Sequence, residues 1–185
     1  MSNNSTPVDI KSYLDESSRT AVKLESLEFD EYTYKRLHYI MNEFVRLGNE
    51  LDCIKKHLFY GKEYPDSMID GYSDSLENNN YASFDSFGVD LVHGLIGKAT
   101  EAVEGIEILQ GYINHPDEPI DVINLEEEIG DGFWYDAMLL RLINSDFESA
   151  ADKNISKLKI RFPDKFDSEK AINRDTIKER QPWNS

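Results

Sequence analysis

Apolar residues recur at helical spacing along most of the chain. Between residues 10 and 60 they repeat mostly at steps of three and four, at Leu37, Ile40, Met41, Phe44, Val45, Leu47, Leu51, Ile54 and Leu58. Such steps place side chains on one stripe of an α-helix, whereas few stretches show the alternation typical of a strand. Segments 85–110 and 122–142 have helical patterns as well. We therefore predict an all-α protein, a helical bundle of four to six helices.

Polar and proline-containing stretches set the limits of these helices. Residues 1–8 are expected to be a disordered tail, the Asn- and Ser-rich segment 61–84 a loop, and 176–185 a second tail. The sequence Ser145-Asp146-Phe147-Glu148 is a capping box and predicts a further helix that ends before Pro163. With these limits, residues 9–175 form a single domain, in which 85–166 supply the helices of the candidate site.

The helix predicted over 122–142 has acidic residues next to apolar and aromatic ones. On a helical wheel, Glu128 and Asp131 lie on the stripe that continues as Tyr135. Beyond Gly132 the helix is apolar almost all round, which is typical of a buried helix. Two ionised carboxylates in such a place destabilise the fold unless they are paired or coordinated.

The helix predicted over 85–110 supplies a matching set of acids. Glu101 and Glu104 share one face with Gly97, where the absence of a side chain would let another group approach the backbone closely. If the two helices pack side by side, four acids approach one point: Glu101, Glu104, Glu128 and Asp131. Hard cations such as Mg²⁺ prefer carboxylate oxygens, so the pattern predicts a magnesium site.

Solvated charge is the alternative interpretation of these acids. The chain has 36 acidic residues among 185, so acids spaced three apart are common on exposed faces. The metal-site hypothesis therefore depends on two such pairs, separated by a proline-containing connection, with an aromatic run beside the second pair.

Composition narrows the classes of function. The net charge of -16 argues against binding to nucleic acid or to an anionic membrane surface. No uninterrupted apolar run approaches the ~18 residues of a membrane-spanning helix. A single cysteine excludes an intramolecular disulfide and fits a reducing compartment, so we expect a soluble cytoplasmic protein. The same charge keeps open a second class, an acidic non-enzymatic binding or regulatory protein, such as a nucleic-acid mimic or an inactive relative of an enzyme.

Three segments in order resemble a known family. They are H93-GLIGKAT-E101-AV-E104-GI-E107, E128-IG-D131-GFWY and N154-IS-K157-LKI-R161-FPDKF. Over about residues 90–175 they resemble the MazG-like branch of the all-α NTP pyrophosphatase superfamily. Further upstream, residues 54–62 (IKKHLFYGK) are similar to a segment of phage members of that family, which would place the protein in the host cytoplasm.

The resemblance implies a function. Members hydrolyse a nucleoside triphosphate to the monophosphate and pyrophosphate by metal-activated water attacking the α-phosphorus. They do so as homo-oligomers, so a homodimer or homotetramer is expected. By this resemblance the Mg²⁺ or Mn²⁺ ligands are Glu101, Glu104, Glu128 and Asp131.

The resemblance also implies residues that bind the substrate. Lys157 and Arg161 share one helix face and would hold the phosphate tail, with Asn154 a further candidate on that face. An exposed basic face is the alternative for this group. His93 is a candidate for substrate contact, although a lone histidine is more often structural. We expect Trp134 in the core rather than against a nucleobase.

The N-terminal half repeats part of the motif. H38-YIMNEFV-R46-LG-N49-EL-D52 has the spacing of residues 93–107 at a constant offset of 55 residues. Arg46 and Asn49 stand at the acid positions and cannot hold Mg²⁺, so residues 9–60 are interpreted as a degenerate half-repeat, with chance similarity of two amphipathic helices as the alternative. If the repeat is real, this helix should pack beside the one that carries Glu101 through an approximate twofold, and Arg46 should lie beside carboxylates in place of a metal.

Overall fold

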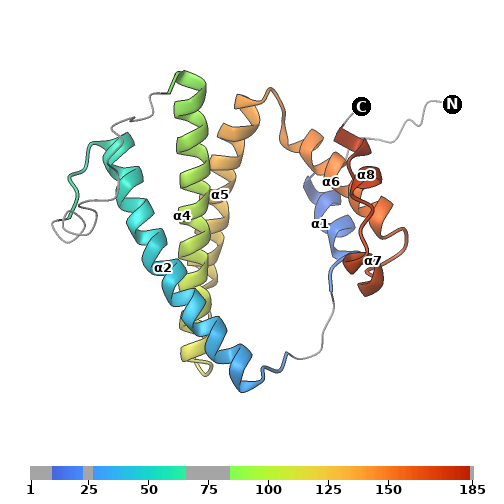
Figure 1. Ribbon diagram of the computed structural model, residues 1–185, viewed down its shortest axis with the longest axis horizontal. Coiled ribbons are helices and arrows are strands. Elements are labelled where there is room, and N and C mark those ends of the chain that lie inside the picture. Colours follow the sequence, from blue (N-terminus) through green and yellow to red (C-terminus); the bar gives the residue numbers. More distant parts are fainter. Residues whose placement is uncertain (1–9, 23–26, 66–83, 184–185) are drawn as a thin grey trace, which may run out of the picture. The chain divides into compact units, whose positions relative to one another are not determined.

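The described part of the chain is built from helices. The computed structural model describes residues 10–22, 27–65 and 84–183, which contain helices and no strand (Figure 1), and this confirms the all-α prediction. The elements are α1 (Ile10–Ser18), α2 (Glu31–Tyr60), α4 (Ser86–Asn114), α5 (Val122–Leu142), α6 (Phe147–Arg161), α7 (Ser168–Ile172), α8 (Thr176–Glu179) and a 3-10 turn, η1 (Gln181–Trp183). None of the described helices is long and apolar enough to cross a membrane.

Some expected segments fall outside this description. The tail expected over 1–8 and most of the loop expected over 61–84 lie beyond the described residues. The segment expected as a tail over 176–185 differs from the expectation up to residue 183, because it forms α8 and η1 and buries Glu179.

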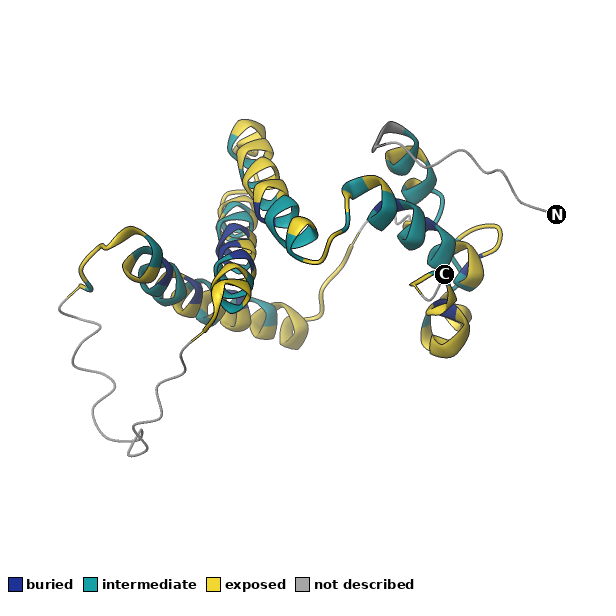
Figure 2. Cartoon of the chain, turned by 90° about the horizontal axis from the view of Figure 1, so that it is seen from above, coloured by how far each residue is buried: buried dark blue, intermediate teal, exposed yellow. Residues whose placement is uncertain are grey.

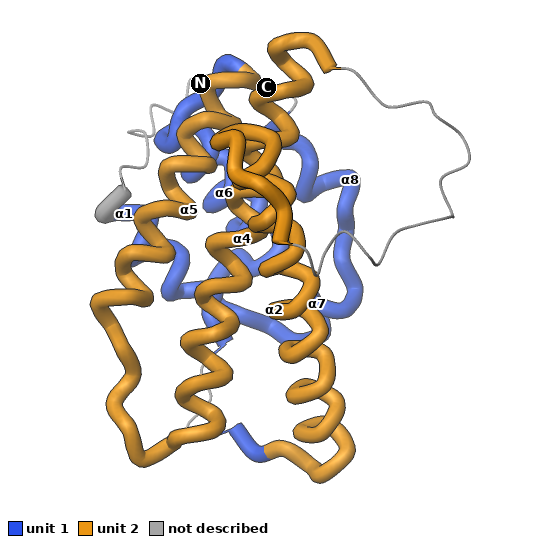
Figure 3. The backbone as a smooth tube through the Cα atoms, turned by 90° about the vertical axis from the view of Figure 1, so that its left-hand side faces the viewer, with its two compact units in different colours: residues 1–28, 144–185 blue, residues 29–143 orange. Residues whose placement is uncertain are grey.

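The sequence analysis predicts a single domain over residues 9–175. In the structure, contacts between residues group the chain into two compact units (Figure 3). One unit comprises residues 29–143 and contains α2, α4 and α5. The other comprises residues 1–28 and 144–185 and contains α1, α6, α7, α8 and η1. The predicted acidic ligands all belong to the first unit.

Aspartates begin the long helices. Asp30, Asp85 and Asp121 each accept a hydrogen bond from a backbone N–H in the first turn of α2, α4 and α5. At α6 the N-cap is Asp146, which accepts from the N–H of Ser149 at 2.7 Å, and not Ser145 as the capping-box pattern predicts. The helix therefore starts one residue later than expected, on a residue type that caps equally well.

The three helices of the 29–143 unit run antiparallel to their neighbours (Figure 1). Near the middle of α2, Asn42 accepts a hydrogen bond from Gln110 of α4, and closer to the C-terminal end of α2 Lys55 donates to Thr100. The α4 and α5 helices pack with Gly94 against Leu139. This pairing places α4 between α2 and α5.

Glycines allow α4 to lie close to both neighbours. A Cβ atom at Gly97 would lie 2.0 Å from the ring of Tyr135, and one at Gly48 would lie 2.1 Å from the side chain of Val103. Both distances are far below a van der Waals contact. The expectation that Gly97 permits a close approach is confirmed, and the approaching group is the Tyr135 ring of α5.

Burial is concentrated in the middle of α4, as the dark blue segments of Figure 2 show. On α5 the buried residue is Tyr135, whereas Trp134 is 52% exposed and Phe133 is also exposed. The prediction that Trp134 belongs to the core is therefore wrong. Its physical reason is that α5 packs mainly against α4 within this unit, so the apolar residues on its other faces remain at the surface.

The second unit combines an N-terminal and a C-terminal segment of the chain, and hydrogen bonds join the two segments. The hydroxyl of Tyr13 on α1 donates to Asn154 of α6 at 3.3 Å, and the Arg19 guanidinium donates to the backbone carbonyl of Phe162 at 3.0 Å. At the C-terminal end of α6, Arg161 binds the buried carboxylate of Glu179 on α8.

Replacing Gly97 with alanine tests the α4–α5 contact. Because the Tyr135 ring must move to make room for the new methyl group, we expect Gly97→Ala to lower the free energy of unfolding by about 1–3 kcal/mol. Gly105→Ala is the matched control on the same helix, since nothing lies within 4 Å of a Cβ there. It should raise stability by about 0.5–1 kcal/mol, measured by urea unfolding. Equal effects of the two variants would contradict the contact.

Candidate metal site

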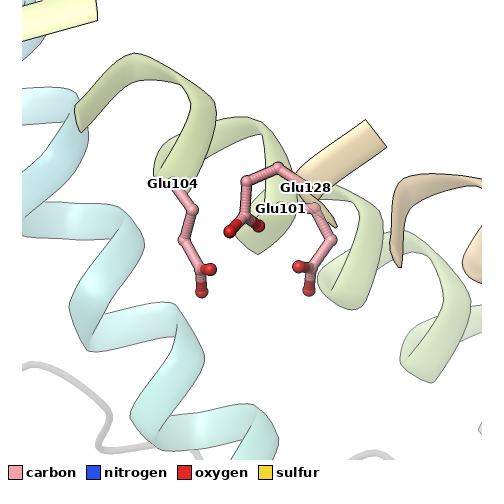
Figure 4. A group of neighbouring side chains, drawn as sticks. All are labelled: Glu101, Glu104 and Glu128. Carbon is pink, nitrogen blue, oxygen red and sulfur yellow. The ribbon is translucent and has the colours of Figure 1, made fainter. Parts of the chain in front are cut away.

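Three carboxylates from two helices converge in the 29–143 unit. Glu101 and Glu104 lie one turn apart on α4, and Glu128 comes from the antiparallel α5. One oxygen of each lies within 4.8 Å of the others. Figure 4 shows the three side chains reaching into the same space. Three of the four acids predicted as ligands are thus brought together.

Glu128 combines a raised pKa with a buried oxygen that has no partner in the described part of the chain. Its Oε2 atom is buried and has no hydrogen-bond partner among the described residues. Burial raises the pKa of this carboxyl to about 7, and the neighbouring acids Glu104, Glu101 and Asp131 act in the same direction. A carboxyl in this position is destabilised when it is charged, unless a cation comes close.

The donor set fits a hard divalent cation. Mg²⁺ and Mn²⁺ take carboxylate and water oxygens, and three glutamates from two facing helices supply such oxygens from a rigid frame. The buried, unpaired Oε2 of Glu128 is the atom that most needs a positive partner. The cluster therefore fits a metal site by its chemistry.

Asp131 lies outside this group of three. It lies three residues after Glu128 on α5 and is exposed. Together with Glu101 it lines a pocket of about 300 Å³, whose other walls are Tyr60, Trp134 and Tyr135. The half-exposed Trp134 is thus a wall of a pocket beside the acids, and its contact with a nucleobase stays a prediction.

His93 belongs to an aromatic cluster. Its ring stacks on Phe59 with ring centroids 4.0 Å apart and lies edge-on to Trp134 and Tyr135 at 6.1 and 5.8 Å. Burial, followed by the charge of Lys55, lowers the pKa of His93, so the ring is neutral at neutral pH. The ring is therefore packed among aromatic side chains, but its Nε2 atom is buried without a hydrogen-bond partner among the described residues, and substrate contact by His93 stays a prediction.

The predicted phosphate-binding residues lie in the other unit and have partners there. Both Nε and Nη2 of Arg161 donate to the carboxylate of Glu179. The Lys157 ammonium lies 5.5 Å from the centre of the Trp183 ring. Asn154 accepts from Tyr13. Their role toward a substrate stays a prediction based on the resemblance.

No protein-family model, characterised protein or solved structure matches this chain.

The residues of the half-repeat lie beside α4. Gly48 and Val103, at the close contact between α2 and α4, are separated by the same offset of 55 residues as the motif. Asn49 donates to Glu107 of α4 at 3.2 Å. Arg46, however, has a half-exposed side chain and binds Glu43 and Glu50 of its own helix. It thus lies beside carboxylates, as the half-repeat interpretation expects, and these two carboxylates belong to its own helix.

A buried cation does lie beside Glu101, and it is Lys55, a residue that the sequence patterns did not single out. Its Nζ atom lies 3.4 Å from Oε1 of Glu101 and donates to Oγ1 of Thr100 at 2.7 Å. A signal for it exists in the sequence, because the buried residues of α2 are Met41, Gly48 and Lys55, at intervals of seven. A lysine on that stripe points toward the neighbouring helix.

The raised pKa of Glu128 predicts a pH dependence of stability. Its pKa is about 7 in the fold against an ordinary 4.5, so its contribution to stability is present below pH 4.5 and is lost as pH rises through 7. We expect the metal-free protein to lose stability over this range and Glu128→Gln to lose less. Melting in chelator between pH 4.5 and 8 measures the difference, and parallel curves for the two proteins would refute the shift. Affinity for Mn²⁺ should rise toward pH 7, because the cation displaces the proton.

The buried Glu179 predicts the opposite pH dependence of stability in the other unit. Hydrogen bonds from Arg161 and then Arg174 lower its pKa to about 2 from an ordinary 4.5. Its stabilisation is therefore present above pH 4.5 and is lost as pH falls toward 2. Glu179→Gln should lower the melting temperature at pH 7, and the gap to the parent should narrow at pH 3. A gap that stays constant between these pH values would show that the ion pair contributes nothing.

Proposed function

We propose that this protein is a Mg²⁺-dependent nucleoside triphosphate pyrophosphohydrolase of MazG-like type. Mn²⁺ would serve in place of Mg²⁺. The observation that carries the proposal is the convergence of Glu101, Glu104 and Glu128 within 4.8 Å, with a buried oxygen of Glu128 that lacks a partner. The order of the acid pairs and the motif resemblance support the same class of reaction.

In the proposed reaction, water attacks the α-phosphorus. A bond forms between the water oxygen and that phosphorus, the bond to the bridging oxygen of the β-phosphate breaks, and pyrophosphate leaves. A divalent cation, when bound, supplies positive charge to the phosphate oxygens and acidifies the attacking water. No protein nucleophile is needed.

The chain contributes position and a binding surface. Glu101 and Glu104 are fixed on the most buried part of α4, so the ligand oxygens need little reorganisation. The adjacent pocket has the exposed aromatic rings of Tyr60 and Trp134 beside the acids Glu101 and Asp131. An aromatic face next to the metal ligands suits a nucleobase, because every base can stack on it.

The exposed apolar side chains of α5 support the expected homo-oligomer. Ile123, Ile129 and Phe133 are all exposed in the single chain. Ile129 and Phe133 lie one turn apart on α5, and neighbouring exposed apolar side chains are common at an interface between proteins. A second copy of the chain that covers α5 is part of the proposal, and light scattering gives the number of subunits.

The acidic binding or regulatory protein remains the rival from another class, and the net charge of -16 favours it. A solvating surface spreads its charge, however, whereas here a carboxylate oxygen is buried among other carboxylates without a partner. That arrangement favours the metal-dependent enzyme.

Pyrophosphate release from a panel of nucleoside triphosphates with Mg²⁺ or Mn²⁺ tests the proposal. We expect turnover with pyrophosphate as the first product and none in chelator. Glu128→Gln should abolish turnover and keep or raise the melting temperature of the metal-free protein, because it removes a repelled charge. Glu126→Gln is the control, an exposed acid on the same helix outside the cluster.

Two outcomes would overturn the proposal. One is orthophosphate as the first product, which indicates attack at a terminal phosphate. The other is full activity of the Glu128→Gln variant.

A further inference from the structure

A buried ammonium group lies at the edge of the carboxylate cluster. Lys55 of α2 is 5% exposed, and its Nζ atom has three oxygens around it. These are Oγ1 of Thr100 at 2.7 Å, Oδ1 of Asp52 at 3.1 Å and Oε1 of Glu101 at 3.4 Å. The ammonium donates hydrogen bonds to Thr100 and Glu101 and forms an ion pair with Asp52.

The surroundings of Lys55 keep it charged. Burial alone lowers the pKa of the ammonium, but the ion pair with Asp52 and the nearby acid Glu101 raise it above its ordinary value. The ring of Tyr135, with its centre 5.5 Å from Nζ, adds an electron-rich face. The group is therefore a fixed positive charge within the unit at neutral pH.

The next residue shows that this placement is specific. Lys56 also pairs with Asp52, but its side chain is 39% exposed, against 6% for the Lys55 side chain. Lys55 follows Met41 and Gly48 on the buried stripe of α2, so its side chain reaches α4. Two adjacent lysines thus share a partner and differ in their contact with the metal-site acids.

We propose that Lys55 is a positioning residue of the metal site, a resident cation that holds one oxygen of Glu101 and offsets part of the charge of the acid cluster. This inference rests on the proposed function, since it concerns the same acids. With Oε1 of Glu101 bound to Lys55 and close to the Thr100 hydroxyl, Oε2 is the atom of that residue for a metal to coordinate. The acids can then stay together before a divalent cation binds.

A resident cation also limits the affinity for the metal. Its charge repels any divalent cation that approaches the same carboxylates, and in a partly buried site that repulsion is only weakly screened. Removing the charge should leave the metal-free cluster less stable and the metal more tightly bound. A lysine with a purely structural role would lower stability without changing metal affinity.

Mn²⁺ binding to the full-length protein provides the test. We expect calorimetry to show Mn²⁺ bound about tenfold more tightly by Lys55→Met than by the parent. The rise in melting temperature on saturation with Mn²⁺ should also be larger in the variant. Lys56→Met is the matched control, and its Mn²⁺ affinity should equal that of the parent. An unchanged or weaker Mn²⁺ affinity of a folded Lys55→Met protein overturns the inference.

Asp52→Asn provides an independent variant if Lys55→Met does not fold. It removes the other acid that holds Lys55, so more of the positive charge acts on Glu101, and Mn²⁺ affinity should fall severalfold. An unchanged affinity of Asp52→Asn counts against the inference. A parent protein that binds no Mn²⁺ at all would instead sink the proposed function, so the two failures are distinguishable.

Discussion

The close packing of α4 against both of its neighbours is the constraint on which the candidate site depends. At Gly97 the Tyr135 ring occupies the space that a side chain would fill, and at Gly48 the same is true of Val103. Carboxylates repel one another, so they do not draw the helices together. Apolar contacts must bring the helices close, and the acids on their faces are then forced within reach of one another.

This forced approach is accommodated in two different ways within one cluster. Glu101 is buried, but Lys55 lies 3.4 Å from its oxygen and supplies the opposite charge. Glu128 is surrounded by other acids, and burial together with these neighbours raises its pKa to about 7. One acid is thus compensated by the chain, whereas the other depends on a proton or a bound cation. An acid cluster with this asymmetry is partly compensated without a bound cation, and Glu128 is the member at which a cation would relieve the remaining repulsion.

Much of the fold follows from local rules, and the exceptions have physical reasons. The bounds of α5 equal the predicted 122–142, because Asp121 caps its start and its apolar period is clear. The spacing of the acids also predicted three members of the cluster. The exposure of Trp134 could not be predicted in the same way, because a helix with apolar residues all round is buried only if other helices cover every face. Lys55 was missed because a lysine in an amphipathic helix is ordinarily a surface residue.

The contrast between Lys55 and Arg46 shows what the degenerate half-repeat explains. Its geometry fits the packing, since Gly48 and Val103 meet at the offset of the motif. Its chemistry is different, because Arg46, at the position that aligns with Glu101, binds acids of its own helix, while Lys55 reaches Glu101 of α4. In an antiparallel pair of helices, the buried stripe of one helix determines which of its residues face the other helix. The sequence alignment of the two helices does not determine this. A helix that supplies none of the three clustered glutamates can therefore still be part of the candidate site, because its buried stripe can supply the counter-charge.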